Sequence, residues 1–398
     1  MECEWKKIKV INSNNEDLLE YRSCPICGCD EYKSIFKLEK FQFFSDADKN
    51  KQADINSVQC EKCSAIFMNP CYSKKGFSIL FEEAGMSYGS SDARPKEQVD
   101  WLNNYKLLEE NARVLDIGCG TGNFLASVPQ NIYKVGVDID KTSISIAEEN
   151  HKNIEFICSS FEDLIYEENI DLITMNHVLE HLSNPKEVLD TLYNLSNRET
   201  RLLIEVPIIE NGLTNDINGF FSVQHLTHFS RNSFKNILVL SGWEIVKWEE
   251  QKDYNGCRVL AKKSSKTKDI EYSKHELINL YKYLSNWYKS ICNVEEKIIK
   301  LEKERYVIWG AGMHLEFLHQ TTSLFKTDKE FIIIDSDKNK HNKSWRGIAI
   351  YSPEILNELI DESIIISSYG SQYKIEETIK SINSNIEIVK LYDYLKVY

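Results

Sequence analysis

The segment "VLDIGCGTGNFL" constrains the fold more than any other stretch of this chain. An apolar run ends at Asp116, a loop with Gly118, Gly120 and Gly122 follows, and "NFLASVP" begins a helical pattern. Glycines let a backbone approach a ligand where a Cβ atom would clash. A strand, a glycine loop and a helix in this order predict a βαβ unit of a parallel sheet, with a binding loop at the carboxyl end of the strand.

The same alternation covers most of the chain. Between about residues 111 and 263, strand patterns recur at roughly 20-residue intervals, with helical patterns such as "KTSISIAEENH" between them. A smaller alternation runs from "YVIWGAG" to "EIVKLYDYL", and residues 270–304 before it predict one or two amphipathic helices. We expect an α/β protein in three parts, residues 1–76, 77–263 and 264–398, of which the first consists of short, polar, strand-like pieces.

Charge and hydropathy argue against a nucleic-acid-binding, secreted or membrane-spanning protein. The net charge of -13 argues against a nucleic-acid partner, because neutralising phosphates requires a basic face. The amino terminus lacks the apolar core of a signal peptide, and no run approaches the roughly 18 apolar residues of a membrane span. We therefore expect a cytoplasmic protein. Its 11 cysteines then need an explanation other than disulfides, and a metal site is the first candidate.

Two cysteine pairs have the spacing of a metal site. "CPIC" and "CEKC" place Cys24, Cys27, Cys60 and Cys63 in two turns, each of which aims two thiolates at one point. Four thiolates in tetrahedral arrangement are the set that structural zinc prefers, and they leave no open position for catalysis. Redox pairs or unrelated thiols are the alternatives, but two spaced pairs are more specific than one. Cys29 and Cys71 lie nearby without matching spacing.

Asp116, the acid just before the glycine loop, indicates which charge the ligand carries. A dinucleotide fingerprint would place a pyrophosphate on the helix that follows, but the Asp116 carboxylate would repel it. Asp116 suits a ligand that carries a positive charge near the loop. Asp138, at the end of the next strand pattern, stands about 20 residues further on, where an acid can bind both hydroxyls of a ribose.

These segments resemble motif I and the following motifs of the class I S-adenosylmethionine-dependent methyltransferases. The resemblance implies that the glycine loop packs against the amino-acid part of the cofactor, and that Asp138, with Ile139 beside it, binds the ribose. It places "CSSFEDL" at the adenine and "MNHVLEHLSNP" beside the cofactor and substrate. The further cofactor residues that it implies are Ser160, Phe161, Asn176 and His177, and His181 would face the substrate.

The order of the three parts resembles the sugar C-methyltransferases that act on nucleotide-linked deoxysugars. Those enzymes have a zinc-binding domain, a Rossmann-like methyltransferase domain and a smaller Rossmann-like domain. "FEEAGMSYGSS", with Tyr88, and "DYNGCRVLAKK" match them too. The resemblance implies that a base removes a proton beside the carbonyl of a ketosugar, and that the resulting carbanion takes the methyl group. Tyr88 is either a hydroxyl partner or a packing aromatic.

The run "NGFFSVQHLTHFS" corresponds to the catalytic loop of that family, whose pattern is roughly Tyr-His-Glu-His. Here Ser222 replaces the tyrosine, Gln224 replaces the glutamate, and His225 is retained as the candidate general base. A neutral glutamine stabilises an imidazolium less well than a carboxylate does, so we expect the pKa of His225 to stay near about 6.5. A weaker base favours an oxygen acceptor over a carbon acid. His228 is expected to be structural or to line the substrate site.

The carboxyl-terminal part carries a second glycine loop, Gly310 to Gly312, but Leu315 stands at the third glycine position of the dinucleotide fingerprint. Asp335 follows where a ribose-binding acid would stand. Of three possible roles for this loop, we favour binding of the nucleotide part of the substrate. A loop that binds no ligand comes second, and a site for a redox cofactor comes last. For the whole chain, the alternatives to a sugar methyltransferase are an O-methyltransferase of another glycan or small metabolite, a nucleic-acid methyltransferase, and a cofactor-binding protein with impaired activity. The oligomeric state stays open.

Overall fold

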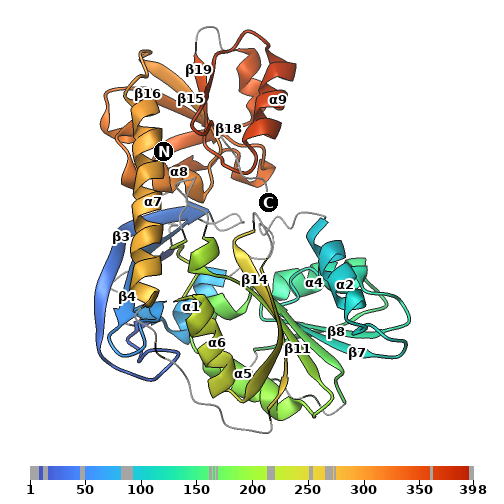
Figure 1. The fold of residues 1–398 in the computed structure, drawn as a ribbon. Coiled ribbons are helices and arrows are strands. Elements are labelled where there is room, and N and C mark those ends of the chain that lie inside the picture. Colours follow the sequence, from blue (N-terminus) through green and yellow to red (C-terminus); the bar gives the residue numbers. More distant parts are fainter. Residues whose placement is uncertain are drawn as a thin grey trace.

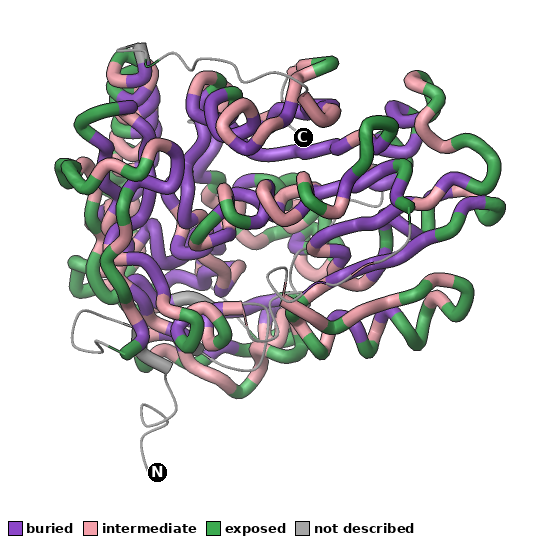
Figure 2. Tube along the Cα trace, turned by 90° about the horizontal axis from the view of Figure 1, so that it is seen from below, coloured by how far each residue is buried: buried purple, intermediate pink, exposed green. Residues whose placement is uncertain are grey.

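The computed structural model describes residues 9–11, 17–44, 50–81, 93–160, 164, 166, 169–212, 220–250, 254–264, 272, 275–358 and 362–393. Within these ranges the chain forms two large α/β sheets and an amino-terminal unit whose strand pairs are antiparallel except for β1 with β4 (Figure 1). Figure 2 shows buried positions concentrated along the strands and on the inner sides of the helices. None of the described helices combines the length and the apolar character needed to cross a membrane.

The central sheet has the strand order β13-β14-β11-β10-β7-β8-β9 among the described residues. Its strands are β7 (Arg113–Ile117), β8 (Tyr133–Asp138), β9 (Glu155–Cys158), β10 (Leu172–Asn176), β11 (Arg201–Pro207), β13 (Trp243–Glu249) and β14 (Gly256–Lys263). Neighbouring pairs are parallel from β9 to β11, whereas β14 runs antiparallel to β11 and to β13. The strand order reverses between β7 and β10, and ligands of open α/β sheets bind at such a point.

The sequence predicts all seven of these strands and the helical segments that follow β7 and β8. The helices of the central part are α2 (Ala93–Asn104), α3 (Asn123–Ser127), α4 (Lys141–Asn150), α5 (Pro185–Leu195) and α6 (Arg231–Leu240). Side-chain caps fix the starts of two of them, because Asp140 caps α4 and Ser230 forms a capping box with Ser233 at α6. The 3-10 helices η3 (Leu179–His181) and η4 (Ile209–Asn211) follow β10 and β11.

The carboxyl-terminal sheet has the order β17-β18-β16-β15-β19-β20 among the described strands, parallel except for β17. Its strands are β15 (Arg305–Trp309), β16 (Glu330–Ile334), β17 (Ser344–Trp345), β18 (Ile348–Tyr351), β19 (Ser363–Ile366) and β20 (Ile388–Lys390), with α8 (Met313–Thr321), α9 (Gln372–Ile382) and the 3-10 helices η5 (Leu324–Lys326), η6 (Lys338–Lys340) and η7 (Pro353–Asn357). The Rossmann-like architecture expected from the alternation is present. A single helix, α7 (His275–Ile298), precedes this sheet and runs beside the amino-terminal strands (Figure 1).

The amino-terminal unit differs from the short strand pieces that we expected. Its strands are β1 (Lys9–Ile11), β2 (Leu19–Glu20), β3 (Tyr32–Phe44), β4 (Asn50–Cys60), β5 (Ile66–Met68) and β6 (Cys71–Tyr72), and α1 (Lys74–Phe81) follows. The pair β3 and β4 is long because its apolar residues pack against the other parts of the chain. The Phe36 ring lies 5.2 Å from Trp287 of α7, and the Phe41 ring lies 4.8 Å from Phe317 of α8.

A strand from the central part completes the amino-terminal sheet. β12 (Thr227–His228) pairs antiparallel with β5, so the segment after β11 joins the sheet that carries the cysteine pairs. α1 spans the expected boundary at residues 76 and 77. The buried hydrophobic clusters also cross these boundaries, since Phe41, Phe221 and Phe317 belong to one cluster. The parts therefore share core residues.

Candidate functional site

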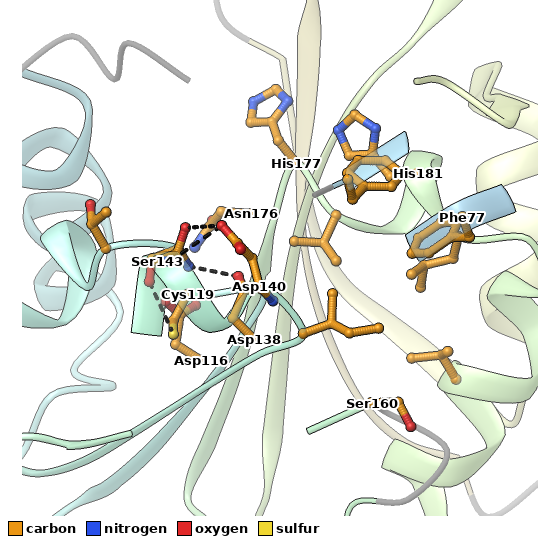
Figure 3. Close-up of a pocket in the computed structure, with 18 of the residues that line it drawn as sticks. Phe77, Asp116, Cys119, Asp138, Asp140, Ser143, Ser160, Asn176, His177 and His181 are labelled. Atoms are coloured by element: carbon orange, nitrogen blue, oxygen red, sulfur yellow. Dashed lines mark hydrogen bonds between the residues drawn. The ribbon is translucent and has the colours of Figure 1, made fainter. Parts of the chain in front are cut away.

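A pocket of about 910 Å³ opens at the carboxyl ends of β7, β8 and β10. Its size lies within the range of small-molecule sites. Its wall combines the glycine loop with residues of α1, α2 and the segment after β10 (Figure 3). Nine residues that the sequence predicts for the site lie on this wall: Asp116, Gly118, Gly120, Asp138, Ile139, Ser160, Asn176, His177 and His181. Phe161 and Tyr88 lie outside the described residues.

The glycine loop takes its shape from close packing. Gly118 has a φ of 71°, and a Cβ atom there would lie 2.3 Å from a methyl group of Val178. Gly120 has a φ of 52° and open space beside it, as a ligand-facing position requires. Gly122 lies outside the pocket wall, because a Cβ atom there would meet the Phe156 ring at 2.7 Å. We expected Gly122 to contact the cofactor, but here it caps α3 and lets helix and sheet pack closely.

Asp138 holds the loop and borders the pocket. Its Oδ2 atom accepts a hydrogen bond of 2.8 Å from the Gly120 N–H, and its Oδ1 accepts one of 2.9 Å from the Asp140 N–H. Burial raises the pKa of Asp138, and these two donors oppose that shift. Ile139 beside it is 39% exposed and lies on the pocket wall, where its apolar surface could cover a ring.

Asp116 is almost completely buried below the glycine loop. Its Oδ1 atom accepts a hydrogen bond of 2.7 Å from the Thr174 hydroxyl. Burial raises the pKa of this carboxyl to about 7, the Thr174 hydrogen bond lowers it, and Asp138 adds to the rise. The sequence predicts a fixed negative charge at this position. In the ligand-free protein the charge is instead costly, and a cationic ligand would favour the ionised form.

Asn176 and His177 end β10 at the rim of the pocket. Neither side-chain atom of Asn176 has a hydrogen-bond partner among the described residues, although both are buried. An unsatisfied amide in a pocket wall is suited to a ligand. His177 adopts a left-handed conformation with a φ of 55°, which non-glycine residues rarely adopt.

His177 belongs to a buried charge network that the sequence did not reveal. Its Nε2 atom lies 3.3 Å from the Glu205 carboxylate and also contacts the Tyr254 hydroxyl, and its Nδ1 lies 3.4 Å from Glu180. Glu205 also accepts hydrogen bonds of 2.6 Å from Tyr254 and 2.7 Å from Arg258. Burial alone would lower the pKa of His177, but the two glutamates raise it to about 9. One sequence signal could have revealed this network: Glu205 and Glu180 stand inside the apolar runs "LLIEVP" and "HVLEHL", where a charged residue is unexpected.

The candidate catalytic histidines lie next to each other, with ring centroids 5.1 Å apart. His181 lies on the pocket wall, whereas His225 and Gln224 are not among the residues that line the pocket. The Nδ1 atom of His181 donates a hydrogen bond of 2.8 Å to the Gln224 carbonyl, so Gln224 orients His181 through its backbone. The geometry therefore favours His181, more than His225, as the group that faces a substrate in this pocket.

The expected pKa of His225 near its usual value was wrong. Loss of solvent lowers the pKa of His225 to about 4, and the neighbouring His181 adds to this. A carboxylate does lie beside the neighbouring ring, because an oxygen of Glu180 lies 3.8 Å from the Nε2 atom of His181. His228 is buried with its Nε2 3.2 Å from the Ser57 hydroxyl, as expected for a structural histidine.

The four predicted metal ligands form one cluster. The Sγ atoms of Cys24, Cys27, Cys60 and Cys63 all lie within 4.8 Å of one another. One thiol of each pair faces one of the other pair, at 3.5 Å for Cys24 and Cys63 and at 3.6 Å for Cys27 and Cys60. Tetrahedral zinc with bonds of about 2.3 Å separates its sulfur ligands by about 3.8 Å, so the cluster fits this ion. Cys29 and Cys71 do not belong to it.

The carboxyl-terminal glycine loop repeats the geometry of the first. Asp335 directly follows β16, and its carboxylate accepts hydrogen bonds of 2.7 Å from the Ala311 N–H and 2.8 Å from the Asp337 N–H. These donors match Gly120 and Asp140 around Asp138. Lys340 lies 3.3 Å from the same carboxylate, which gives Asp335 a partner that Asp138 does not have among the described ion pairs.

The raised pKa of Asp116 predicts a pH-dependent stability effect. Between pH 4 and pH 7 the native carboxyl keeps a proton that the unfolded chain loses, so its contribution to stability falls as the pH rises. Asp116→Asn should therefore raise the melting temperature at pH 8 and have little effect near pH 4. The shift corresponds to at most about 4 kcal/mol. Differential scanning fluorimetry of both proteins, with the exposed Asp100→Asn as control, measures the difference; an equal effect at both pH values would contradict the prediction.

Comparisons with known proteins identify the central part. A family model described as a methyltransferase domain matches residues 93–247. An uncharacterized protein of Methanocaldococcus jannaschii is 38% identical over 131 residues, 33% of this chain and 60% of that protein. The ubiquinone biosynthesis O-methyltransferase of Glaesserella parasuis is 32% identical over 103 residues, 23% of this chain and 44% of that enzyme. The chain thus spans less than two thirds of the length of either relative.

The structure of magnesium protoporphyrin IX methyltransferase from Synechocystis, with bound S-adenosylmethionine, matches 47% of this chain and 97% of that chain. The TM-score is 0.37 and the sequence identity is 18%. The matched family model, the strand order of the central sheet and the glycine loop at its switch point agree with one another. Residues 93–247 therefore match a methyltransferase domain.

Proposed function

We propose that the protein transfers a methyl group from S-adenosylmethionine to a small-molecule acceptor, a nucleotide-linked sugar. One observation carries the proposal: a single pocket joins the glycine loop and its acids to a wall with histidines. Figure 3 shows Asp116, Asp138 and Cys119 at one end of this pocket and His177 and His181 at the other. A cofactor end and an acceptor end in one cavity are what methyl transfer requires.

The cofactor end offers a partner for each part of S-adenosylmethionine. The Asp138 carboxylate borders the pocket and suits the ribose hydroxyls, and the exposed Ile139 and the half-buried Ser160 suit the adenine. The backbone at Gly118 and Gly120 leaves room for the amino-acid part, and Asp116 below it would gain from the cofactor's positive charge. When bound, the cofactor supplies a methyl group on a cationic sulfur.

At the acceptor end, His181 is the candidate proton acceptor. Its Nδ1 atom carries the hydrogen that it donates to the Gln224 carbonyl, so Nε2 is the basic nitrogen of the neutral ring. Glu180, 3.8 Å from that nitrogen, would stabilise the imidazolium that forms. His225 supports His181 from behind. An oxygen acceptor was preferred because the histidine base was expected to lack a carboxylate to strengthen it. Glu180 supplies that carboxylate, so the proposal covers both oxygen and carbon acceptors.

The choice of a nucleotide-linked sugar rests on two features. The first is the resemblance of the three-part order to the sugar C-methyltransferases. The second is the acid Asp335 beside the loop at Gly310, which accepts hydrogen bonds from two backbone N–H groups in the same arrangement as the ribose-binding candidate Asp138 does. The net charge of -13 supports a small-molecule substrate over a nucleic acid. Another glycan or metabolite, and a chain that binds the cofactor without catalysis, are the competing functions. The proposed location is the cytoplasm.

Substitution of Asp138 tests the cofactor site. Asp138→Ala removes the acceptors for the ribose hydroxyls and should weaken S-adenosylmethionine binding by about 10- to 100-fold, since hydrogen bonds to charged groups contribute about 1.5–3 kcal/mol. Isothermal titration calorimetry measures the affinity, and the exposed Asp100→Ala should bind like the native protein. Unchanged affinity in Asp138→Ala would show that the cofactor lies elsewhere.

The acceptor class can be tested with cofactor labelled in the methyl group. Incubation with nucleoside-diphosphate ketosugars should transfer the label to the sugar, whereas the matching free sugars should stay unlabelled. His181→Ala should lower the rate by at least about 100-fold, the usual contribution of a general base, while the affinity for S-adenosylmethionine is kept. Equal labelling of free sugars, or transfer only to other metabolites, would refute the proposed substrate class.

We further propose that the four-cysteine cluster binds structural zinc. Mass spectrometry of the metal content should find one zinc fewer per chain in Cys60→Ser than in the native protein, with a melting temperature lower by several degrees, because structural zinc contributes to folding. Cys292→Ser on α7 is the matched control, since Cys292 lies outside the cluster. An unchanged zinc content in Cys60→Ser would exclude this site.

A further inference from the structure

Three potential metal ligands meet beside the pocket. Glu180 and His181 end the 3-10 helix η3, and His225 comes from the segment before β12. A carboxylate oxygen of Glu180 and a ring nitrogen of each histidine lie within 4.8 Å of one another. The His181 Nε2 and Glu180 Oε1 atoms are 3.8 Å apart. Ligands about 2.1 Å from a common ion lie about 3–4 Å apart, so small side-chain shifts would complete the site.

The two histidines are oriented as metal ligands usually are. The Nδ1 atom of His181 lies 2.8 Å from the Gln224 carbonyl oxygen, and the Nδ1 atom of His225 lies 3.3 Å from the Phe220 carbonyl oxygen. A carbonyl only accepts, so each Nδ1 carries the hydrogen and each Nε2 keeps its lone pair. Metal-binding histidines typically donate their second N–H in this way, which fixes both tautomer and ring orientation.

Glu180 provides a second, independent observation. Its side chain is 1% exposed, and neither carboxylate oxygen has a hydrogen-bond partner among the described residues. A buried carboxylate without hydrogen bonds is costly and uncommon. The Nδ1 atom of His177, 3.4 Å away, supplies charge, but His177 is shared with Glu205, which Arg258 already pairs at 2.7 Å. Glu180 can therefore bind a further cation.

We propose that Glu180, His181 and His225 bind a divalent transition-metal ion at the acceptor end of the pocket. Two imidazoles and one carboxylate suit ions such as Zn²⁺, Mn²⁺ or Fe²⁺ better than Mg²⁺ or Ca²⁺, which prefer oxygen ligands. Three protein ligands leave positions open for an exogenous oxygen, in contrast to the closed four-cysteine cluster. His181 lies on the pocket wall, so the ion would border the cavity.

The role of the ion in the reaction rests on the proposed methyl transfer, whereas its binding does not. An acceptor oxygen would bind the ion and lose its proton to water, because a metal ion stabilises the anion. The new bond then forms between the acceptor atom and the methyl carbon, the bond from that carbon to sulfur breaks, and its electron pair stays on sulfur. With the ion bound, the Nε2 atoms of His181 and His225 would be metal ligands and would no longer act as proton acceptors.

Mn²⁺ is a suitable probe, because its electron paramagnetic resonance signal reports free ions and the thiolate cluster disfavours it. The full chain, with its zinc retained, is titrated with MnCl₂. We expect one saturable Mn²⁺ site per chain, with affinity reduced at least about tenfold in Glu180→Gln and in His225→Asn, each of which removes one ligand. His151→Gln, whose histidine lies outside the cluster, should bind as the native protein does.

The affinity for S-adenosylmethionine, measured on the same preparations, separates this inference from the proposed function. Variants that keep native cofactor affinity are folded, and Mn²⁺ affinities are compared among these alone. Absence of saturable Mn²⁺ binding in the native chain, or equal binding in the folded variants, overturns the metal site even if the cofactor binds. Mn²⁺ binding lost in the variants supports it even if no acceptor is methylated.

Discussion

A single guanidinium group connects the cysteine cluster to the loops of the site. Arg22 lies two residues before Cys24, and its side chain donates to the carbonyl groups of Met68, Ser183 and Leu226, the last at 2.5 Å. Its own backbone N–H and C=O are bound by the side chain of Asn69. Charged donors to carbonyls form the stronger class of hydrogen bonds, and each segment here comes from a different part of the chain. Arg22, next to the cluster in sequence, therefore links the segments at Met68, Ser183 and Leu226.

The consequence for the histidines is direct. Ser183 follows His181 by two residues, and Leu226 follows His225 by one, so Arg22 fixes the backbone beside both rings. The pairing of β12 with β5 adds a second constraint on the same segment. Through Arg22 and the β12–β5 pairing, the amino-terminal unit that carries the four cysteines helps to set how His181 and His225 lie relative to each other. Precise placement of such groups requires a rigid surrounding, and here that surrounding is supplied by the amino-terminal unit.

The sequence predicts what depends on local patterns. The glycine loop, Asp138 and the cysteine pairs each form within a few residues or one βαβ unit, and their spacing is sufficient. The charge network could not be predicted, because Glu205 meets Arg258 only through the register of β11 and β14, where the two are direct partners. The conclusion drawn from Gln224 failed for the same reason. The carboxylate beside the histidines is Glu180, which precedes Gln224 by 44 residues in the sequence. Glu180 comes close to the segment with Gln224 and His225 only because η3 packs against β12.

The strained backbone at His177 is best explained by this network. A left-handed conformation costs about 1–2 kcal/mol for a residue other than glycine. It turns the ring toward Glu180 and Glu205, while the His177 N–H still donates a hydrogen bond of 2.8 Å to the Glu205 carbonyl. Asn176, its neighbour, keeps a buried amide without a partner in the described part of the chain. The ion pairs of His177 offset the cost of its backbone conformation, whereas nothing among the described residues offsets the buried amide of Asn176. The amide of Asn176 lies on the wall of the pocket that also carries the glycine loop and His181, where a ligand would supply its missing hydrogen bonds.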